Sequence, residues 1–192
     1  MLPTPCREEV KKYLSLWDSS EIYTSPDSAL KKLFTQTYPN NSCMDEILIK
    51  VSCLNDFYGT NIYDTFSVAK HILSLNIDDK LQNGFISLVD DMAFVKMKDG
   101  KTKRFYSFAT KYCHHHSPLA FPIYDSYVDK VLRYFKKTDM FFDFKNDDLR
   151  DYRKYTDILN RFKSYYEIEN FNVKEIDIYL WQLGKEHFPS AY

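Results

Sequence analysis

The chain has 192 residues, of which 44% are hydrophobic, and this is enough to bury a substantial core without disulfides or metal. Its formal net charge of −1 excludes a uniformly basic nucleic-acid binder. No secretory signal, membrane-length apolar run or metal-ligand spacing is apparent, and the cysteines are widely spaced: Cys6, Cys43, Cys53 and Cys113. We therefore expect a cytoplasmic, monomeric protein that uses no metal and no cofactor.

Helical periodicity dominates the chain, and only four glycines are available for β-turns. Recurring apolar residues and capping signals predict helices over residues 10–17, 25–34, 42–54, 62–73, 78–83, 85–92, 105–116, 125–135, 149–166 and 174–187. The second helix is expected to begin at Ser25-Pro26, and Ser42 is expected to cap the third. Residues 93–98 form the only candidate strand. The sequence predicts an all-α fold, as a single domain over residues 1–192 with two helical lobes.

Residues 105–128 carry the most informative pattern. Four residues fall at i, i+3, i+4 and i+7 on one helix face and are assigned to the core: Phe105, Phe108, Ala109 and Tyr112. Polar residues occupy the opposite face, which we expect to be exposed: Arg104, Ser107, Lys111 and His114. After Pro118 and Pro122, an aspartate, Asp125, stands at the start of the next helix. An acid held there beside a basic helix face suits chemistry on a phosphate-bearing substrate.

Charge is unevenly distributed along the chain. Residues 96–137 contain ten Lys and Arg against three Asp, a local charge of +7 on an otherwise acidic body. A basic region of this kind is consistent with phosphate recognition, although a solvated charged face would look the same. The triplet His114–His116 is not a metal site, because adjacent helical residues point about 100° apart. One of these histidines could meet a phosphate, or all three are helix C-terminal residues favoured by the macrodipole.

The residues PIYDSYV, 122–128, form a motif that is similar to one in a known family. This segment, with Ser107 placed 18 residues before Asp125, resembles the helix-hairpin-helix (HhH-GPD) DNA glycosylase superfamily. Residues 49–73 resemble the helix–loop–helix in which these enzymes place base-wedge residues. The resemblance covers about residues 45–137, with the N- and C-terminal helices forming the second lobe. The family's glycine hairpin is replaced here by MKDGKTKRFY, residues 97–106, with Gly100 alone.

The resemblance implies a role for each matching residue. Asp125 would be the catalytic carboxylate, although capping its helix would also explain it. Ser107 stands where bifunctional members carry a Schiff-base lysine, which implies a monofunctional enzyme. Lys111, one turn on, would be a phosphate contact, a solvated lysine or a substitute amine. The remaining candidates are the base wedge Asn55, Tyr58 and Asn61, the pocket residues Tyr63 and Tyr124, and the phosphate-binding Lys101, Lys103 and Arg104 with Lys111.

These assignments imply a monofunctional DNA glycosylase. It would flip a modified or damaged base out of double-stranded DNA and hydrolyse its N-glycosidic bond, in repair or in defence against phage with modified DNA. Two other readings stay open at the level of sequence. One is a non-catalytic helical nucleic-acid-binding module, and the other is a helical protein-interaction domain whose basic face is incidental.

Overall fold

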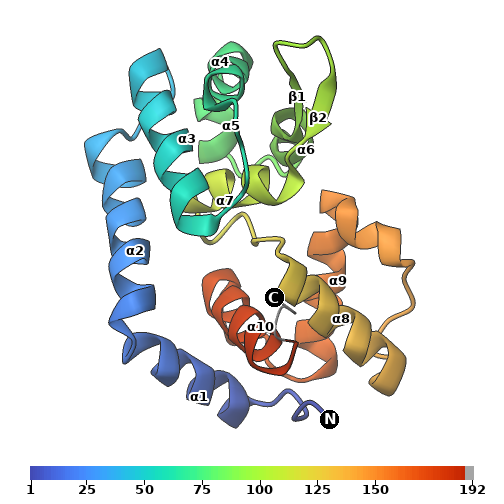
Figure 1. The fold of residues 1–192 in the computed structure, drawn as a ribbon. Coiled ribbons are helices and arrows are strands. Elements are labelled where there is room, and N and C mark those ends of the chain that lie inside the picture. Colours follow the sequence, from blue (N-terminus) through green and yellow to red (C-terminus); the bar gives the residue numbers. More distant parts are fainter. Residues whose placement is uncertain (189–192) are drawn as a thin grey trace. The chain divides into compact units, whose positions relative to one another are not determined.

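The computed structural model describes residues 1–188, and its fold is all-α apart from one short hairpin (Figure 1). The helices are α1 (Arg7–Asp18), α2 (Glu21–Lys32), α3 (Met44–Tyr58), α4 (Thr65–Leu75), α5 (Asp78–Gln82), α6 (Leu88–Ala93), α7 (Tyr106–His116), α8 (Ser126–Asp139), α9 (Tyr152–Tyr165) and α10 (Val173–His187). A π-helical turn, η1 (Leu33–Thr37), extends α2, and a 3₁₀ turn, η2 (Asn146–Arg150), precedes α9. The hairpin pairs β1 (Phe94–Lys96) with β2 (Thr102–Arg104).

The chain divides into two compact units, each with its own core. The central unit is Thr24–Ile123, and the terminal unit combines Met1–Tyr23 with the chain from Tyr124 onward. One boundary falls inside α2 and the other lies just before α8. In the described part of the chain, none of the helices combines the length and the apolar character needed to cross a bilayer.

The terminal unit is built on α8, whose apolar residues lie on one face as their spacing predicts. Val128, Val131, Leu132 and Phe135 are all buried. Helix α10 packs against both α8 and α1. Its approach to α8 is so close that a Cβ atom added at Gly184 would lie 2.7 Å from the Cβ of Tyr127 and 2.8 Å from its carbonyl oxygen. A glycine is therefore required where these two helices meet.

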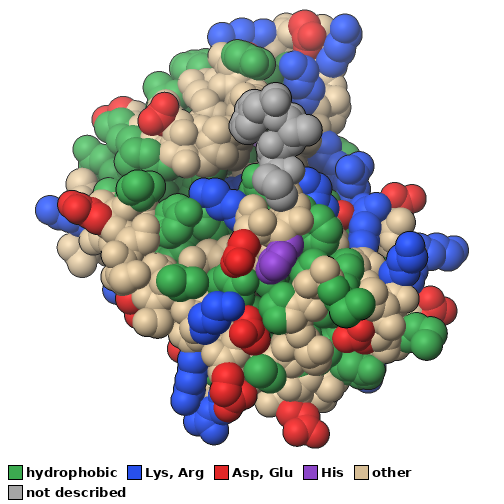
Figure 2. Space-filling model, turned by 60° about the horizontal axis from the view of Figure 1, so that its bottom comes forward, with side chains coloured by type: hydrophobic (Ala, Val, Ile, Leu, Met, Phe, Trp, Pro, Cys, Tyr) green, Lys and Arg blue, Asp and Glu red, His purple; other side chains and the backbone are tan. Residues whose placement is uncertain are grey.

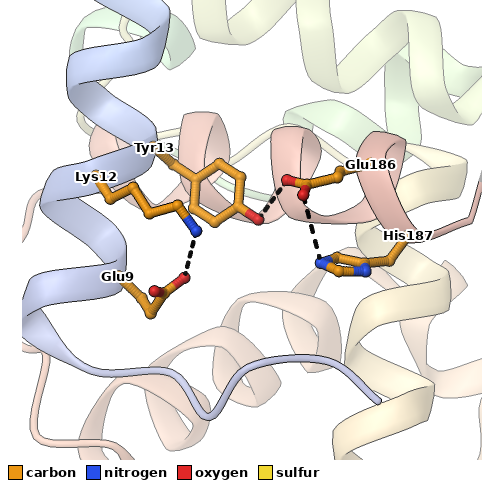
Figure 3. A network of polar contacts seen from close by, with 5 residues as sticks. All are labelled: Glu9, Lys12, Tyr13, Glu186 and His187. Atoms are coloured by element: carbon orange, nitrogen blue, oxygen red, sulfur yellow. Dashed lines mark hydrogen bonds and ion pairs between the residues drawn. The ribbon is translucent and has the colours of Figure 1, made fainter.

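Helix α1 is fixed to α10 by polar contacts as well as by packing (Figure 3). The buried Tyr13 donates its hydroxyl to Glu186 Oε2 at 2.7 Å, and its carbonyl oxygen accepts from Gln182 Nε2, also at 2.7 Å. Burial raises the pKa of the Tyr13 phenol well above its usual range, and Glu186 raises it further. The hydroxyl therefore stays protonated and remains a donor to this carboxylate. Glu186 also lies 4.0 Å from the His187 ring nitrogen.

The central unit is built around α3, which packs against α4 and α7, while α6 packs against α7. Several helix boundaries differ from the sequence prediction. Helix α2 begins at Glu21 rather than at Ser25, so Pro26 lies inside it and leaves one helical carbonyl without its amide donor. Helix α3 follows Cys43 rather than Ser42, without a side-chain cap. Helix α4 starts at Thr65, capped by Asp64, whose Oδ1 accepts from the Ser67 amide at 3.1 Å.

The candidate strand at residues 93–98 is confirmed as β1, but its partner β2 was not predicted. Phe94 pairs with Arg104, Val95 with Lys103 and Lys96 with Thr102. Gly100 takes a φ of 80° in the connecting turn, a conformation that glycine adopts without strain. A β-hairpin, not a helical hairpin, thus joins α6 to α7. Near the C-terminus, the helix predicted from residue 149 begins later, at Tyr152, with Asp151 as its cap.

The prediction of an exposed polar face on the helix at residues 105–116 is wrong for two of its members. Lys111 is 3% exposed and His114 is also 3% exposed, and buried residues occur all round α7. A helix surrounded by protein must bury its polar face as well as its apolar one. The core assignment of Phe108, Ala109 and Tyr112 is confirmed, whereas Phe105, the residue before α7, is only partly buried.

The close approach of α10 to α8 gives a stability prediction. Gly184→Ala should lower the free energy of unfolding by about 1–3 kcal/mol, because overpacking outweighs the roughly 1 kcal/mol that alanine gains over glycine in a helix. Urea denaturation followed by circular dichroism would measure the change. Ser164→Ala, at an exposed position of α9, is the matched control and should be neutral or slightly stabilising. A Gly184→Ala protein at least as stable as wild type would contradict this packing.

Candidate functional site

Asp125 is the residue just before α8. Its backbone is extended, with φ −137° and ψ 157°, and its Oδ1 accepts a hydrogen bond from the Tyr127 amide at 2.9 Å. The amphipathic pattern of α8 fixes where the helix starts, and so fixes the carboxylate at the positive end of a 14-residue helix dipole. This position suits a carboxylate that must be held in one place. It also suits a structural cap.

Tyr124 is engaged within the terminal unit. Its hydroxyl donates to Asp129 Oδ2 at 2.9 Å, and its ring packs edge-on against Tyr155, with 5.6 Å between the centroids. Burial, and then the nearby Asp129 carboxylate, raise the pKa of the Tyr124 phenol. Tyr124 is thus fixed through its ring by Tyr155 and through its hydroxyl by Asp129, and this orders the backbone next to Asp125.

The candidate wedge residues divide into two groups. The Asn55 amide is committed to the loop after α3: its Oδ1 accepts from Thr60 Oγ1 at 2.8 Å and from the Ile62 amide at 2.9 Å, and its Nδ2 donates to the Ile62 carbonyl at 3.2 Å. Asn61, by contrast, is exposed with a φ of 56°, and Tyr63 is 93% exposed. The tip of this loop, not Asn55, presents side chains to solvent.

Ser107 and Lys111 come together on α7. Lys111 Nζ donates to Ser107 Oγ at 2.7 Å and lies 4.9 Å from the centre of the Tyr58 ring. The Tyr58 hydroxyl in turn lies 3.0 Å from His115 Nε2. The i, i+4 spacing accounts for the first contact, and burial makes it worth more than it would be on a solvated surface. Lys111 is therefore a buried side chain rather than an exposed phosphate contact.

The basic residues of the hairpin differ in how far they are engaged. Arg104 stacks over Phe94 and Tyr106, at 5.2 and 4.5 Å from the ring centres, and lies 3.7 Å from Asp90. Lys101 and Lys103 are exposed, and over residues 1–188 their ammonium groups make no ion pair. On the face drawn in Figure 2, Lys and Arg side chains are interspersed with Asp and Glu. The hairpin lysines are the better candidates for contacting an anionic partner.

The three histidines at the end of α7 point to three different partners. His114 Nδ1 lies 2.8 Å from the Phe121 carbonyl oxygen, His115 contacts Tyr58, and His116 Nε2 lies 3.4 Å from Lys50 Nζ. Burial, and then the Lys50 charge, lower the pKa of His116 to about 3, so this ring is neutral at pH 7 and is not a macrodipole-stabilised cation. No cluster of three potential metal ligands occurs in residues 1–188.

The most buried charged group is one that sequence reasoning missed. Lys50 on α3 is 0% exposed, and its Nζ donates to the carbonyl oxygens of Tyr38 (3.1 Å) and Asn40 (2.8 Å) and to Asn41 Oδ1 (2.6 Å). The signal was present, because residue 50 falls on the core face with Ile47, Val51 and Leu54 at i, i+3, i+4 and i+7 spacing. A lysine at a core position of a helical pattern indicates a buried ammonium group.

The surroundings of Lys50 form a closed network. Asn41 also accepts from the Tyr112 hydroxyl at 2.6 Å, and it donates its backbone N–H and its Nδ2 to the two oxygens of Asp78, at 3.0 and 2.6 Å. Burial lowers the pKa of Lys50 to about 8, against the opposing effect of the Asp78 and Glu46 charges. The network joins the loop after η1 to α3, α5 and α7.

Comparison with known proteins places this chain in a family. The family model HI_0787_N, described as an N-terminal domain, matches residues 9–120. The chain belongs to this family. The match includes Lys50 and its partners, and it ends before Asp125.

A protein of Haemophilus influenzae (strain ATCC 51907 / DSM 11121 / KW20 / Rd) is 42% identical over 197 residues, covering 97% of this chain and 94% of the relative. Its printed name, "Uncharacterized protein", assigns no activity. No solved structure matches the chain.

The lowered pKa of Lys50 predicts a distinctive pH dependence. Between about pH 8 and 10.5 the unfolded chain holds a proton that the folded chain has lost, so stability should rise with pH through this window. Lys50→Met cannot titrate at this position. Between about pH 8 and 10.5 the free energy of unfolding of the wild type should therefore rise by about 3 kcal/mol relative to that of Lys50→Met. Chemical denaturation at intervals of half a pH unit would measure the difference.

The exposed Lys31→Met is the matched control for this experiment, and its difference from wild type should stay flat with pH. Tyrosine ionisation affects all three proteins and cancels in the comparison. A flat difference between wild type and Lys50→Met would mean that Lys50 is not the buried cation described above.

Proposed function

We propose that the protein is a monofunctional DNA glycosylase. It acts in the cytoplasm, as a monomer, on a modified or damaged base in double-stranded DNA, in repair or in defence against phage with modified DNA. The observation that carries the proposal is Asp125, a single carboxylate held by a helix N-terminus in the sequence context of the glycosylase superfamily. A fixed carboxylate is the group that this reaction needs.

The reaction breaks the bond between C1′ of the sugar and the base nitrogen. The bonding electron pair leaves with the base, and positive charge develops on C1′ and the ring oxygen of the sugar. An anionic Asp125 would stabilise this charge, or take a proton from the attacking water as its oxygen bonds to C1′. The products are an abasic site and a free base that carries the added proton.

The absence of lyase chemistry is proposed from Ser107. A serine has no amine with which to form an imine with the sugar, so water remains the nucleophile. Lys111 supplies the nearest amine on α7, but its Nζ is buried and donates to Ser107 Oγ. We propose that Lys111 orders Ser107 and does not act as a substitute nucleophile.

DNA contact is proposed for two exposed features of the central unit. Lys101 and Lys103 on the hairpin would neutralise phosphates, in place of the backbone amides of a glycine hairpin. Asn61 at the loop tip would enter the space left by the extruded base, and the exposed ring of Tyr63 would stack on that base. Arg104, held by two rings and Asp90, would support the hairpin rather than bind phosphate itself.

A non-catalytic nucleic-acid-binding module is the second candidate. It is favoured by the hydrogen bond from the Tyr127 amide to Asp125, since helix capping alone accounts for that aspartate. In this case the hairpin lysines would bind DNA and Asp125 would only start α8.

Asp125→Asn separates the two candidates. Asparagine caps a helix as well as aspartate does, so the fold should be kept while the charge at C1′ is lost. Base release from a modified-base duplex, followed by mass spectrometry of the freed bases, should slow by roughly 100-fold or more.

Asp151→Asn is the matched control for Asp125→Asn. Asp151 caps α9 through the Lys154 amide at 3.2 Å, so the same change at another helix start should leave the rate unaltered. Base release that is unchanged in Asp125→Asn would remove the catalytic assignment. If wild type releases no base from any modified duplex yet binds DNA, the second candidate stands.

The hairpin lysines should determine how DNA binding depends on salt. Each phosphate neutralised by a lysine contributes roughly −0.9 to the slope of log affinity against log salt. Lys101→Gln with Lys103→Gln should therefore flatten the slope by about 2 units. Fluorescence anisotropy with a labelled duplex at several salt concentrations would measure it.

The matched control removes the same charge elsewhere. Lys31→Gln with Lys32→Gln, at the exposed end of α2, should leave the slope as in wild type. An equal change in both double variants would show only a general charge effect. A flat slope in the wild type would exclude nucleic acid as the partner.

A further inference from the structure

The central unit contains a pocket of about 240 Å³ beside the Lys50 network. It is lined by residues of η1 and the loop that follows it, of α5 and of the end of α7: Phe34, Thr35, Pro39, Asn40, Asp78, Leu81, Gln82, His116 and Ser117. All of them belong to Thr24–Ile123, so the pocket is complete within one unit. Its volume lies just below the range of drug-sized ligand sites, which suits a small ring system.

The pocket carries almost no net charge. Its one ionisable acid, Asp78, already accepts two hydrogen bonds from Asn41, one on each carboxylate oxygen. The nearby Lys50 ammonium offsets this charge, and Lys50 is itself enclosed by oxygen atoms. An anion or a cation would enter without a counter-charge free to hold it, so the pocket favours an uncharged ligand.

The wall formed by His116 has a defined hydrogen-bonding state. The three N–H groups of the Lys50 ammonium point to Tyr38, Asn40 and Asn41, and its positive charge lies 3.4 Å from His116 Nε2. A lone pair is favoured over an N–H group opposite a cation, which places the ring proton on Nδ1. His116 makes no other hydrogen bond among residues 1–188. Its ring also packs edge-on against Phe34, with centroids 5.0 Å apart. The pocket therefore has a rigid aromatic corner carrying one N–H donor.

The other polar groups of the pocket provide both donors and acceptors. The side chains of Asn40, Gln82 and Ser117 make no hydrogen bonds over the described residues. Two amides, one hydroxyl and one imidazole N–H can pair with a ring that carries carbonyl, amino and N–H groups along its edge. The apolar lining residues Phe34, Pro39 and Leu81 can contact the faces of such a ring.

We propose that this pocket binds an uncharged planar heterocycle of the nucleobase class. Nucleobases combine a flat apolar face with alternating donors and acceptors, and proteins read them by stacking and edge hydrogen bonds. The proposal does not rest on the glycosylase assignment, because it uses neither Asp125 nor the hairpin lysines. It adds a small-molecule site to the central unit, whichever function the rest of the chain serves.

Calorimetric titration of the full chain with free bases tests the proposal. The probes are adenine, hypoxanthine, cytosine and uracil, with inorganic phosphate and guanidinium as charged comparisons. At least one base should bind saturably, and neither ion should displace it. Gln82→Leu and His116→Phe should each weaken binding roughly 3- to 10-fold, the loss expected for one hydrogen bond between neutral groups.

Gln36→Leu is the matched control, because Gln36 lies on η1, is exposed and does not line the pocket. It should bind as wild type does, and so should Asp125→Asn, which separates this site from the proposed glycosylase reaction. His116→Phe could also disturb Lys50. If the two pocket variants give different results, the result for Gln82→Leu is therefore the decisive one. The proposal is overturned if none of the bases saturates the protein, if Gln82→Leu binds as tightly as wild type, or if phosphate competes with the base.

Discussion

The central unit depends on one buried ammonium group. Lys50 reaches from α3 into the loop after η1 and binds two backbone carbonyls and Asn41, whose amide in turn holds Asp78 on α5. Tyr112 on α7 donates to the same Asn41 oxygen. Burying a charge is costly unless polar partners replace its water, and here uncharged oxygens replace it. A network that is satisfied in this way specifies one arrangement of the segments that it joins.

The same network affects the charge and hydrogen bonding of the groups that line the neighbouring pocket. Burial, and then the Lys50 charge that faces His116 Nε2, lower the pKa of this ring, so a histidine at a pocket wall is neutral rather than a cation. Lys50 also holds Asn41, which donates to both oxygens of Asp78, the one acid in the lining. The Asp78 carboxylate and the nearby Lys50 ammonium therefore offset one another. Its polar groups suit recognition of a neutral ring better than acid–base catalysis.

Helix starts illustrate how one residue can serve two purposes. Asp64, Asp125 and Asp151 each accept a backbone N–H at the beginning of a helix, so capping geometry by itself does not separate a catalytic acid from a structural one. What distinguishes Asp125 is its sequence context, PIYDSYV, rather than its hydrogen bond. The proposed glycosylase reaction therefore rests on a motif that the structure holds rigidly.

Sequence periodicity was sufficient where one face of a helix meets solvent. The core face of α8 and the all-α class followed from apolar spacing, because an amphipathic helix has only one way to bury its stripe. Periodicity was not sufficient for α7, where polar residues are buried by neighbours distant in sequence. It also missed β2, whose exposed residues form a strand only because β1 pairs with them.

The amino-acid sequence by itself determined which segments are helical, where most of the core lies, and that Asp125 begins a helix. Only the tertiary structure decided that Lys111 is buried, that Asn55 bonds to its own loop, and that Lys50 on α3 meets His116 on α7. The physical reason is the range of the interactions. Helix formation and capping act over a few residues, whereas burial and the pairing of polar groups depend on which distant side chains the fold brings together.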